Sequence, residues 1–118
     1  MKTGNFEDLV VWQKTHSFVL QIYRLTRTYP ANEKICLINQ TRRAAVSIAA
    51  NIAEGHRKGK RDFARYLDIA QGSLQETKYH LILSRDLTYC CDADFEILMN
   101  SADEIGKMLN GLRRSLIL

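Results

Sequence analysis

The chain has few of the residues that interrupt helices and no pattern typical of strands. Its 118 residues include one proline, Pro30, and six glycines. Proline and glycine mark turns and loops, so their scarcity favours long helices. No stretch alternates between apolar and polar residues with a period of two between turn residues, as a half-buried strand would. We therefore expect an all-α fold.

Features of membrane, secreted and zinc-binding proteins are also missing. No segment reaches the roughly 18 consecutive apolar residues of a membrane span, and the start MKTGNFEDLVVW lacks the long apolar stretch of a secretory signal. The cysteines Cys36, Cys90 and Cys91 form no C-x-x-C pair. We expect a cytoplasmic protein with no membrane association and with reduced thiols, Cys36 being packed as a small apolar residue. An intermolecular disulfide through Cys90 or Cys91 is the alternative.

Patterns that carry catalysis are equally scarce. The chain has no glycine-rich phosphate loop, no His and Cys cluster and no pair of the E-x-x-H motifs that di-iron bundles use. Asn51 and Glu54 lie three residues apart, and Glu76 is the one carboxylate expected to join them. Acid–base catalysis would need that second carboxylate within a pocket. We expect no enzymatic activity, no cofactor, no metal and no small-molecule substrate.

Apolar and small residues recur every three or four positions in four stretches, which is typical of amphipathic helices. The predicted helices lie near residues 7–28, 32–54, 61–88 and 93–116, within one domain spanning residues 1–118. Short connections make consecutive helices antiparallel. The predicted fold is an up-down-up-down antiparallel four-helix bundle, with buried stripes that include Thr15, Thr41 and Thr77.

Residues at the predicted helix ends supply start and stop signals. Asn5 is placed to cap the first helix, with Asp8 three residues later, and Asp92 is placed to cap the fourth. Pro30 ends the first helix, because the residue before a proline avoids the helical conformation. Gly55 is expected to end the second helix in the left-handed conformation.

Small residues line the second and third predicted helices. They are Ala44, Ala45, Ser47, Ala49, Ala50 and Ala53, followed by Ala70, Gly72 and Ser73. A glycine inside a helix costs about 1 kcal/mol relative to alanine, which close approach of another backbone would offset. We therefore predict that the two helices cross tightly at Gly72, so that Gly72→Leu destabilises the fold or an oligomer.

The formal net charge of +4 is unevenly distributed along the chain. Residues 54–65 contain five basic and two acidic side chains, whereas residues 86–106 contain six acidic side chains and no basic one. A basic cluster favours anions such as nucleic acid. The opposite charges also suit a self-associating ring in which the acidic stretch of one copy faces the basic stretch of the next.

The basic residues near the second turn are the candidates for nucleic-acid binding: Arg42, Arg57, Lys58, Lys60, Arg61 and Arg65. Repetition in an oligomer would provide several phosphate contacts, and the alternative is a solvated turn. Structural or interface roles are expected for Trp12, Gln40, Arg43, Asn51, Glu54, Gly55, Gly72, Ser73 and Glu76. Arg43 is expected to pair with Asn51, Glu54 and Glu76 within the bundle or across a subunit interface, and the alternative is a phosphate contact that lines the ring. Trp12, with Val10 and Tyr66, is expected to form an exposed apolar stripe that covers a neighbouring subunit.

Four segments resemble a known family over nearly the whole chain. QTRRAAVSIAANIAEG (residues 40–55) is similar to the Q-I-R-R-A-A-x-S-I-P-x-N-I-A-E-G signature of four-helix bundle proteins encoded by intervening sequences in bacterial 23S ribosomal RNA genes. LVVWQK (residues 9–14), YLDIAQGSLQET (residues 66–77) and KMLNGL (residues 107–112) resemble further segments of that family, in the same order.

The resemblance implies a homopentameric ring around an axial opening. The accessory proteins of diversity-generating retroelements share that fold and ring, and they bind nucleic acid. No enzymatic activity is established for the intervening-sequence proteins, for which nucleic-acid binding is the leading hypothesis. Two predicted functions remain open for this chain: an oligomer that binds RNA or DNA, and a scaffold ring that binds protein alone.

Three positions depart from the family pattern. Ala49 replaces a proline, so the second helix is expected to be straighter. Ile35 and Cys36 replace a Tyr-Gly pair before Leu37, at the entry to the second helix. Lys60 stands near a position where serine or threonine often caps the third helix, which makes this turn more basic.

Overall fold

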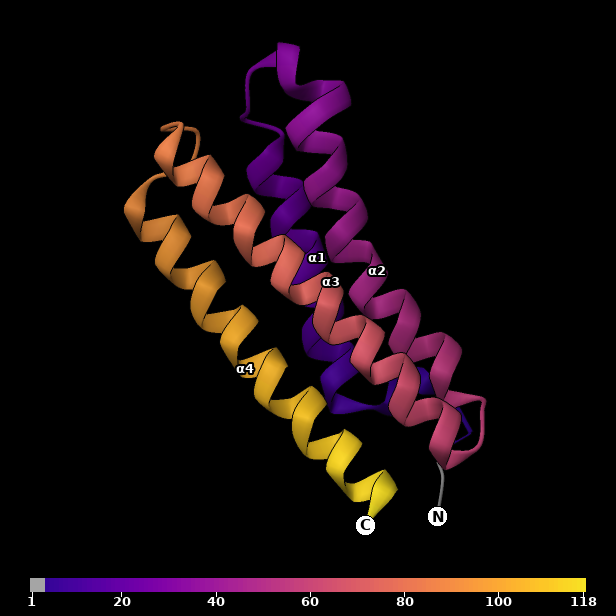
Figure 1. Cartoon of the computed structure of the whole chain (residues 1–118). Helices are drawn as coiled ribbons and strands as arrows, with labels where there is room; N and C mark the ends of the chain where they lie inside the picture. Colours follow the sequence, from indigo (N-terminus) through magenta and orange to yellow (C-terminus); the bar gives the residue numbers. More distant parts are fainter. Residues whose placement is uncertain (1–3) are drawn as a thin grey trace.

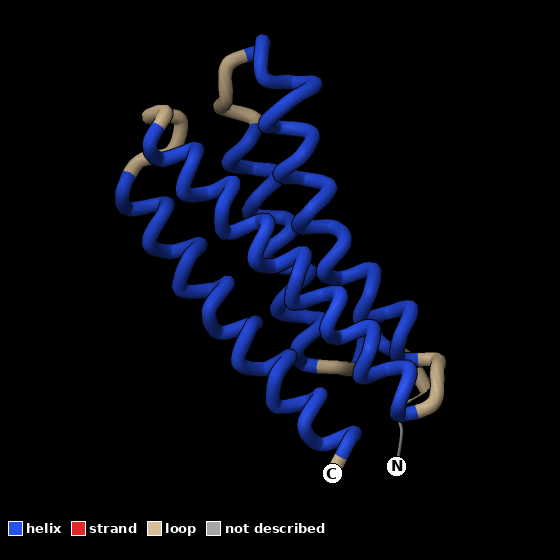
Figure 2. The backbone as a smooth tube through the Cα atoms, viewed as in Figure 1, coloured by secondary structure: helices blue, strands red, loops and turns tan. Residues whose placement is uncertain are grey.

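A computed structural model describes residues 4–118, and within that range it contains four long helices and no strand (Figures 1 and 2). The helices are α1 (Val10–Thr26), α2 (Asn39–His56), α3 (Lys60–Asp86) and α4 (Asp92–Ile117). Consecutive helices run in opposite directions, and α1 contacts both α2 and α4. The all-α prediction is confirmed, and the packing is compatible with the predicted bundle.

The apolar stripes of the four helices meet in one core that runs along the bundle. Its largest fully buried side chains are Phe18, Ile22, Ile48, Ile52, Leu67, Leu74, Leu81, Ile105 and Leu109. Thr15, Thr41 and Thr77 are fully buried as well, and each hydroxyl donates to the carbonyl four residues earlier at 2.7–2.8 Å. The stripes therefore tolerate threonine because each buried hydroxyl is hydrogen-bonded.

The chain begins with a short 3-10 turn rather than with the first long helix. This turn spans Phe6–Asp8, and the Asn5 side chain accepts a hydrogen bond from the Glu7 backbone N–H at 3.0 Å. Regular α1 starts at Val10 without a side-chain cap. Asn5 is thus a cap, but it caps the 3-10 turn and not α1.

The start of α2 lies later than predicted. Residues 31–38 form a 3-10 turn (Ala31–Glu33) and a π-helical turn (Lys34–Ile38), and the regular helix begins only at Asn39. Ile35 and Cys36 are exposed in this segment, whereas Leu37 and Ile38 are buried against Tyr29. The prediction that Cys36 is packed inside was therefore wrong, because the π turn directs its side chain outward.

The tight crossing of α2 and α3 occurs at Gly55, not at Gly72. Gly55 is buried within α2, and none of the described glycines has a positive φ, so the predicted left-handed stop was wrong. A Cβ atom on Gly55 would lie 2.6 Å from the Cβ of Tyr66 and 2.9 Å from Cδ1 of Phe63. Gly72 is exposed, and a Cβ atom added there would have no neighbour within 4 Å, so the predicted close approach was also wrong within one chain.

The ends of α3 and the start of α4 use backbone geometry instead of side-chain caps. Gly59 precedes α3, and Cys91 precedes α4 without a capping hydrogen bond, so the prediction that Asp92 caps α4 was wrong. At the other end of α3, the Tyr89 N–H donates to the Ser84 carbonyl and the Thr88 N–H to the Arg85 carbonyl, both at 2.9 Å. This is a Schellman motif, in which Thr88 (φ 65°) occupies the left-handed position that glycine usually fills.

Candidate nucleic-acid interface

The turn between α2 and α3 gathers five of the six predicted nucleic-acid-binding residues. This basic turn, residues 57–65, contains Arg57, Lys58, Lys60, Arg61 and Arg65. Phe63 anchors it, because its ring is buried in the core and packs edge-to-face against buried His56 at a centroid distance of 5.8 Å. The cations therefore project from a turn that the core holds in place.

Two of these cations pair with carboxylates on their own helices. Arg57 lies 3.0 Å from Glu54, and Arg65 lies 3.7 Å from Asp62. The two arginine side chains nevertheless remain 70% and 72% exposed. Exposed ion pairs of this kind contribute about 0–1 kcal/mol, so a phosphate group could replace either carboxylate at little cost.

The remaining cations of the basic turn face solvent or an aromatic ring. The Lys58 ammonium lies 5.8 Å from the centroid of the Tyr66 ring, and Lys60 and Arg61 are exposed. Tyr66 is half-buried beside Gly55. With Phe63 in the core, little aromatic surface is left for stacking bases, so the chemistry of the turn favours contacts to phosphates.

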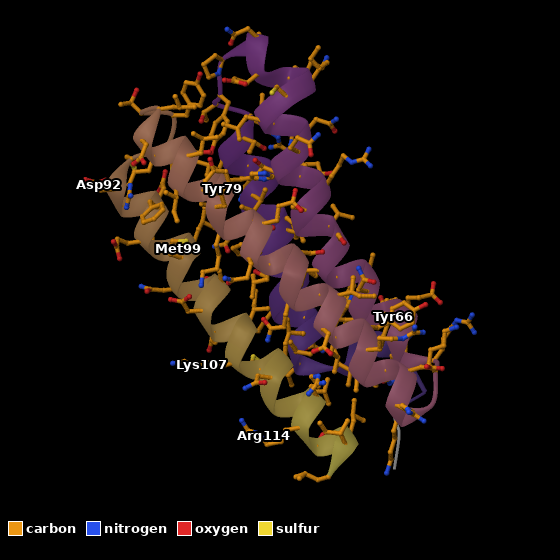
Figure 3. All side chains as sticks on the ribbon, in the orientation of Figure 1. Tyr66, Tyr79, Asp92, Met99, Lys107 and Arg114 are labelled. Carbon is orange, nitrogen blue, oxygen red and sulfur yellow. The ribbon has the colours of Figure 1, made fainter. Side chains whose placement is uncertain are left out.

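The C-terminal end of α4 lies at the same end of the bundle as the basic turn (Figures 1 and 3). It adds Arg114, which is exposed, and Arg113, which forms an ion pair with Asp68 of α3 at 2.6 Å. Sequence reasoning missed both arginines, although the antiparallel order of the helices could have placed them. The short turn Phe6–Asp8, which contacts α2, lies at this end as well, and its two carboxylates, Glu7 and Asp8, reduce the positive charge there.

Arg42, the sixth predicted nucleic-acid-binding residue, lies away from the basic turn. Its Nε donates to the Thr26 hydroxyl at 2.8 Å, and its Nη2 donates to the Tyr23 carbonyl at 3.3 Å. The guanidinium also lies 4.5 Å from the centroid of the Tyr23 ring. Arg42 therefore joins α2 to the C-terminal end of α1.

Polar residues between α2 and α3 form a small network. The hydroxyls of Ser47 and Ser73 are 2.8 Å apart, and the Asn51 side-chain amide donates to the Ser47 carbonyl at 2.8 Å and to its hydroxyl at 3.1 Å. These groups satisfy one another where the helices pack closely. Among the predicted structural residues, Asn51 and Ser73 thus belong to the contact between the two helices.

The other predicted structural residues do not meet as expected. Arg43 is exposed and makes no ion pair or hydrogen bond with another residue of the described chain, so its predicted pairing with Asn51, Glu54 and Glu76 is absent within one subunit. Glu76 instead lies 3.7 Å from His80. Burial lowers the pKa of His80, an effect that Glu76 only partly opposes, so this pair attracts weakly at neutral pH.

The Trp12 ring packs mainly against residues of its own chain. Its ring stacks on His16 at 5.0 Å and meets Phe6 edge-on at 5.2 Å, and it packs against the core. Val10 remains 60% exposed, and Tyr66 is half-buried at the contact between α2 and α3. The predicted apolar stripe is thus narrower than the sequence indicates. Gln40 is exposed on α2.

Residues 4–118 offer no group of three or more His, Cys, Asp or Glu side chains that could hold a metal ion. Within the same range, no helix has the length and apolar composition to cross a membrane. Carboxylates near the polar network have different partners, since Glu54 accepts a hydrogen bond from Arg57 and Glu76 lies next to His80.

Comparisons with known proteins identify the family. Residues 7–111 match the model of the 23S rRNA-intervening sequence protein family. No curated protein matches the chain. Among solved structures, the chain is similar to a protein of unknown function from the S23 ribosomal protein family of Bacteroides thetaiotaomicron, with 31% identity, a TM-score of 0.80, and coverage of 88% of this chain and 98% of that one. The chain therefore belongs to the 23S rRNA-intervening sequence protein family.

Proposed function

We propose that the protein is a homo-oligomer that binds RNA or DNA backbone through the basic turn, without catalysis. The observation that carries this proposal is the excess of cations at the turn: residues 54–65 contain five basic and two acidic side chains. Both acids are already engaged by Arg57 and Arg65 in exposed pairs. The turn of each copy thus keeps an excess of positive charge that attracts phosphates.

Repetition strengthens this electrostatic argument. The family resemblance implies five copies, which would bring five basic turns onto one rim of the assembly. Each phosphate that a cation neutralises releases condensed counterions, so affinity rises steeply with the number of contacts. Because phosphates carry no sequence information, the bound nucleic acid would be recognised by its charge and shape rather than by its bases.

Fluorescence anisotropy with labelled structured RNA, duplex DNA and single strands tests the proposal. The test variant is Arg57→Ala/Lys58→Ala/Lys60→Ala/Arg61→Ala. The matched control, Arg24→Ala/Arg27→Ala/Lys34→Ala/Lys107→Ala, removes the same charge from exposed positions elsewhere. We expect the test variant to lose binding and the control to keep most of it, with both showing the wild-type subunit number by light scattering. Equal binding by both variants would refute a role for the basic turn.

A scaffold ring that binds only protein is the second candidate, and an exposed apolar surface on α3 favours it. Ile69 and Tyr79 are 49% and 58% exposed on the same side of α3, with exposed Gly72 between them. The two side chains are ten residues apart, about 15 Å along α3, so a neighbouring subunit lying along this side of the helix would cover both. We expect Ile69→Glu to reduce the subunit number measured by light scattering. The control is Gln75→Ala, at an exposed position on the same helix, and it should leave the subunit number unchanged. Asp68 is not used as the control because it pairs with Arg113.

A further inference from the structure

An open groove of about 580 Å³ lies on the surface of α1 and α2, away from the basic turn. Its lining residues are Tyr23 from α1 and Asn39, Arg42, Arg43, Val46, Ser47 and Ala50 from α2. Two of these residues carry a guanidinium, and none carries a carboxylate. The groove is therefore positively charged and offers hydrogen-bond donors.

The Arg42 side chain is held in place by contacts to α1. The guanidinium is fixed by hydrogen bonds to the Thr26 hydroxyl and the Tyr23 carbonyl and by its position over the Tyr23 ring. These bonds use two of its five N–H groups and leave three. Because the side chain is already ordered, an oxyanion that binds it imposes little further loss of side-chain entropy.

Arg43 supplies a second, unpaired guanidinium at the same groove. Its side chain is exposed, and within residues 4–118 that side chain has no carboxylate partner and no hydrogen bond. An arginine without a partner is fully available to a phosphate, which it can bind through two parallel hydrogen bonds. The groove thus presents one arginine that is held by hydrogen bonds and one that is unpaired, and no carboxylate lines it to compete with a phosphate.

The groove and the basic turn lie on one side of α2. Arg43 and Arg57 are 14 residues apart, which is close to four helical turns and about 21 Å at 1.5 Å per residue. Ala50 lies midway and is exposed, so a strand could pass close to the helix there. Glu54 also lies on this side, but its carboxylate is held by Arg57.

We propose that this groove is a second phosphate-binding site, into which a nucleic-acid strand continues along α2 from the basic turn. The proposal rests on the proposed function, since the basic turn supplies the first contact. A stacked strand advances about 3.4 Å per nucleotide, so the distance of about 21 Å corresponds to about six nucleotides. A stacked strand shorter than that does not reach both sites of one subunit.

Strand length therefore separates the two sites experimentally. Anisotropy titrations would use labelled oligoadenylates of four and twelve nucleotides with wild type, Arg43→Ala and Arg43→Lys. Arg27→Ala is the matched control, because Arg27 is exposed at the end of α1 and does not line the groove. We expect Arg43→Ala to weaken binding of the 12-mer several-fold and to reduce its log–log salt slope by about 0.7, the value for one phosphate contact on a single strand. The tetramer should bind Arg43→Ala and wild type equally, and Arg43→Lys should restore part of the affinity for the 12-mer.

The outcomes distinguish this proposal from the proposed function. Suppose that the four-alanine variant of the basic turn no longer binds either oligonucleotide, while Arg43→Ala binds the 12-mer like wild type. That result would refute the second phosphate site in the groove and would support nucleic-acid binding by the basic turn. If Arg43→Ala lowered the affinity for the tetramer and the 12-mer by the same factor, the change would be a general effect of charge. That result would refute the proposal that one strand spans the basic turn and the groove. Binding of both lengths by the basic-turn variant would overturn the proposed function itself.

Discussion

Adding a single methyl group at Gly55 tests the packing of α2 against α3. In Gly55→Ala the new Cβ would lie 2.6 Å from the Cβ of Tyr66 and 2.9 Å from Phe63. A Cβ cannot move away without its backbone, so the helices must separate or α3 must shift. Overpacking of this kind costs about 1–3 kcal/mol, and the helix propensity of alanine returns about 1 kcal/mol. Because the Cβ of Tyr66 would lie only 2.6 Å away, the upper part of that range, about 2–3 kcal/mol, applies, and we expect a net loss of about 1–2 kcal/mol in the free energy of unfolding.

Urea denaturation at fixed protein concentration, followed by circular dichroism, would measure this loss as a lower midpoint. Gly72→Ala is the matched control, because Gly72 is helical and exposed, with nothing within 4 Å of its added Cβ. It should gain up to about 1 kcal/mol. The two variants thus make the same chemical change with opposite expected signs. A Gly55→Ala protein as stable as wild type would refute the close crossing at that position.

Three further predictions concern the connection between α3 and α4. Thr88→Gly should stabilise the protein by about 1 kcal/mol in urea denaturation, since it relieves the left-handed strain at φ 65°, whereas Thr88→Ala should not. Cys91→Asp should add about 1 kcal/mol by capping α4, a gain that calorimetry would detect as a higher Tm. Burial raises the pKa of the Cys90 thiol from 9.0 to about 11. The unfolded chain therefore releases this proton at lower pH than the folded chain, so the free energy of unfolding should fall as the pH rises from 9 to 11. At pH 8 a thiol reagent should modify the exposed Cys36 and Cys91 quickly, but the buried Cys90 only after unfolding.

Much of the fold could be predicted from periodicity because long amphipathic helices repeat one signal many times. Thr15, Thr41 and Thr77 all lie in the predicted stripes, and all are fully buried. Helix ends rest on single residues and were harder to predict. Gly55, for example, can either end a helix or admit a neighbour, and only the position of Tyr66 decides between these roles.

The candidate site was predictable where it is local in sequence. The basic turn is one continuous segment, so its cations could be grouped from the sequence alone. The groove required knowledge of where α1 lies against α2, because Tyr23 and Thr26 orient Arg42 from a different helix. Arg113 and Arg114 reach the end of the bundle near the basic turn only through the length and direction of α4.

The salt dependence of RNA binding by the wild-type protein tests the central claim most directly. If phosphate contacts at the basic turn drive binding, the logarithm of the association constant should fall linearly with the logarithm of the salt concentration. Its slope should be about −2 or steeper, as three contacts to a single strand would give. Binding that is unchanged between low and moderate salt, or no binding at low salt, would contradict the account.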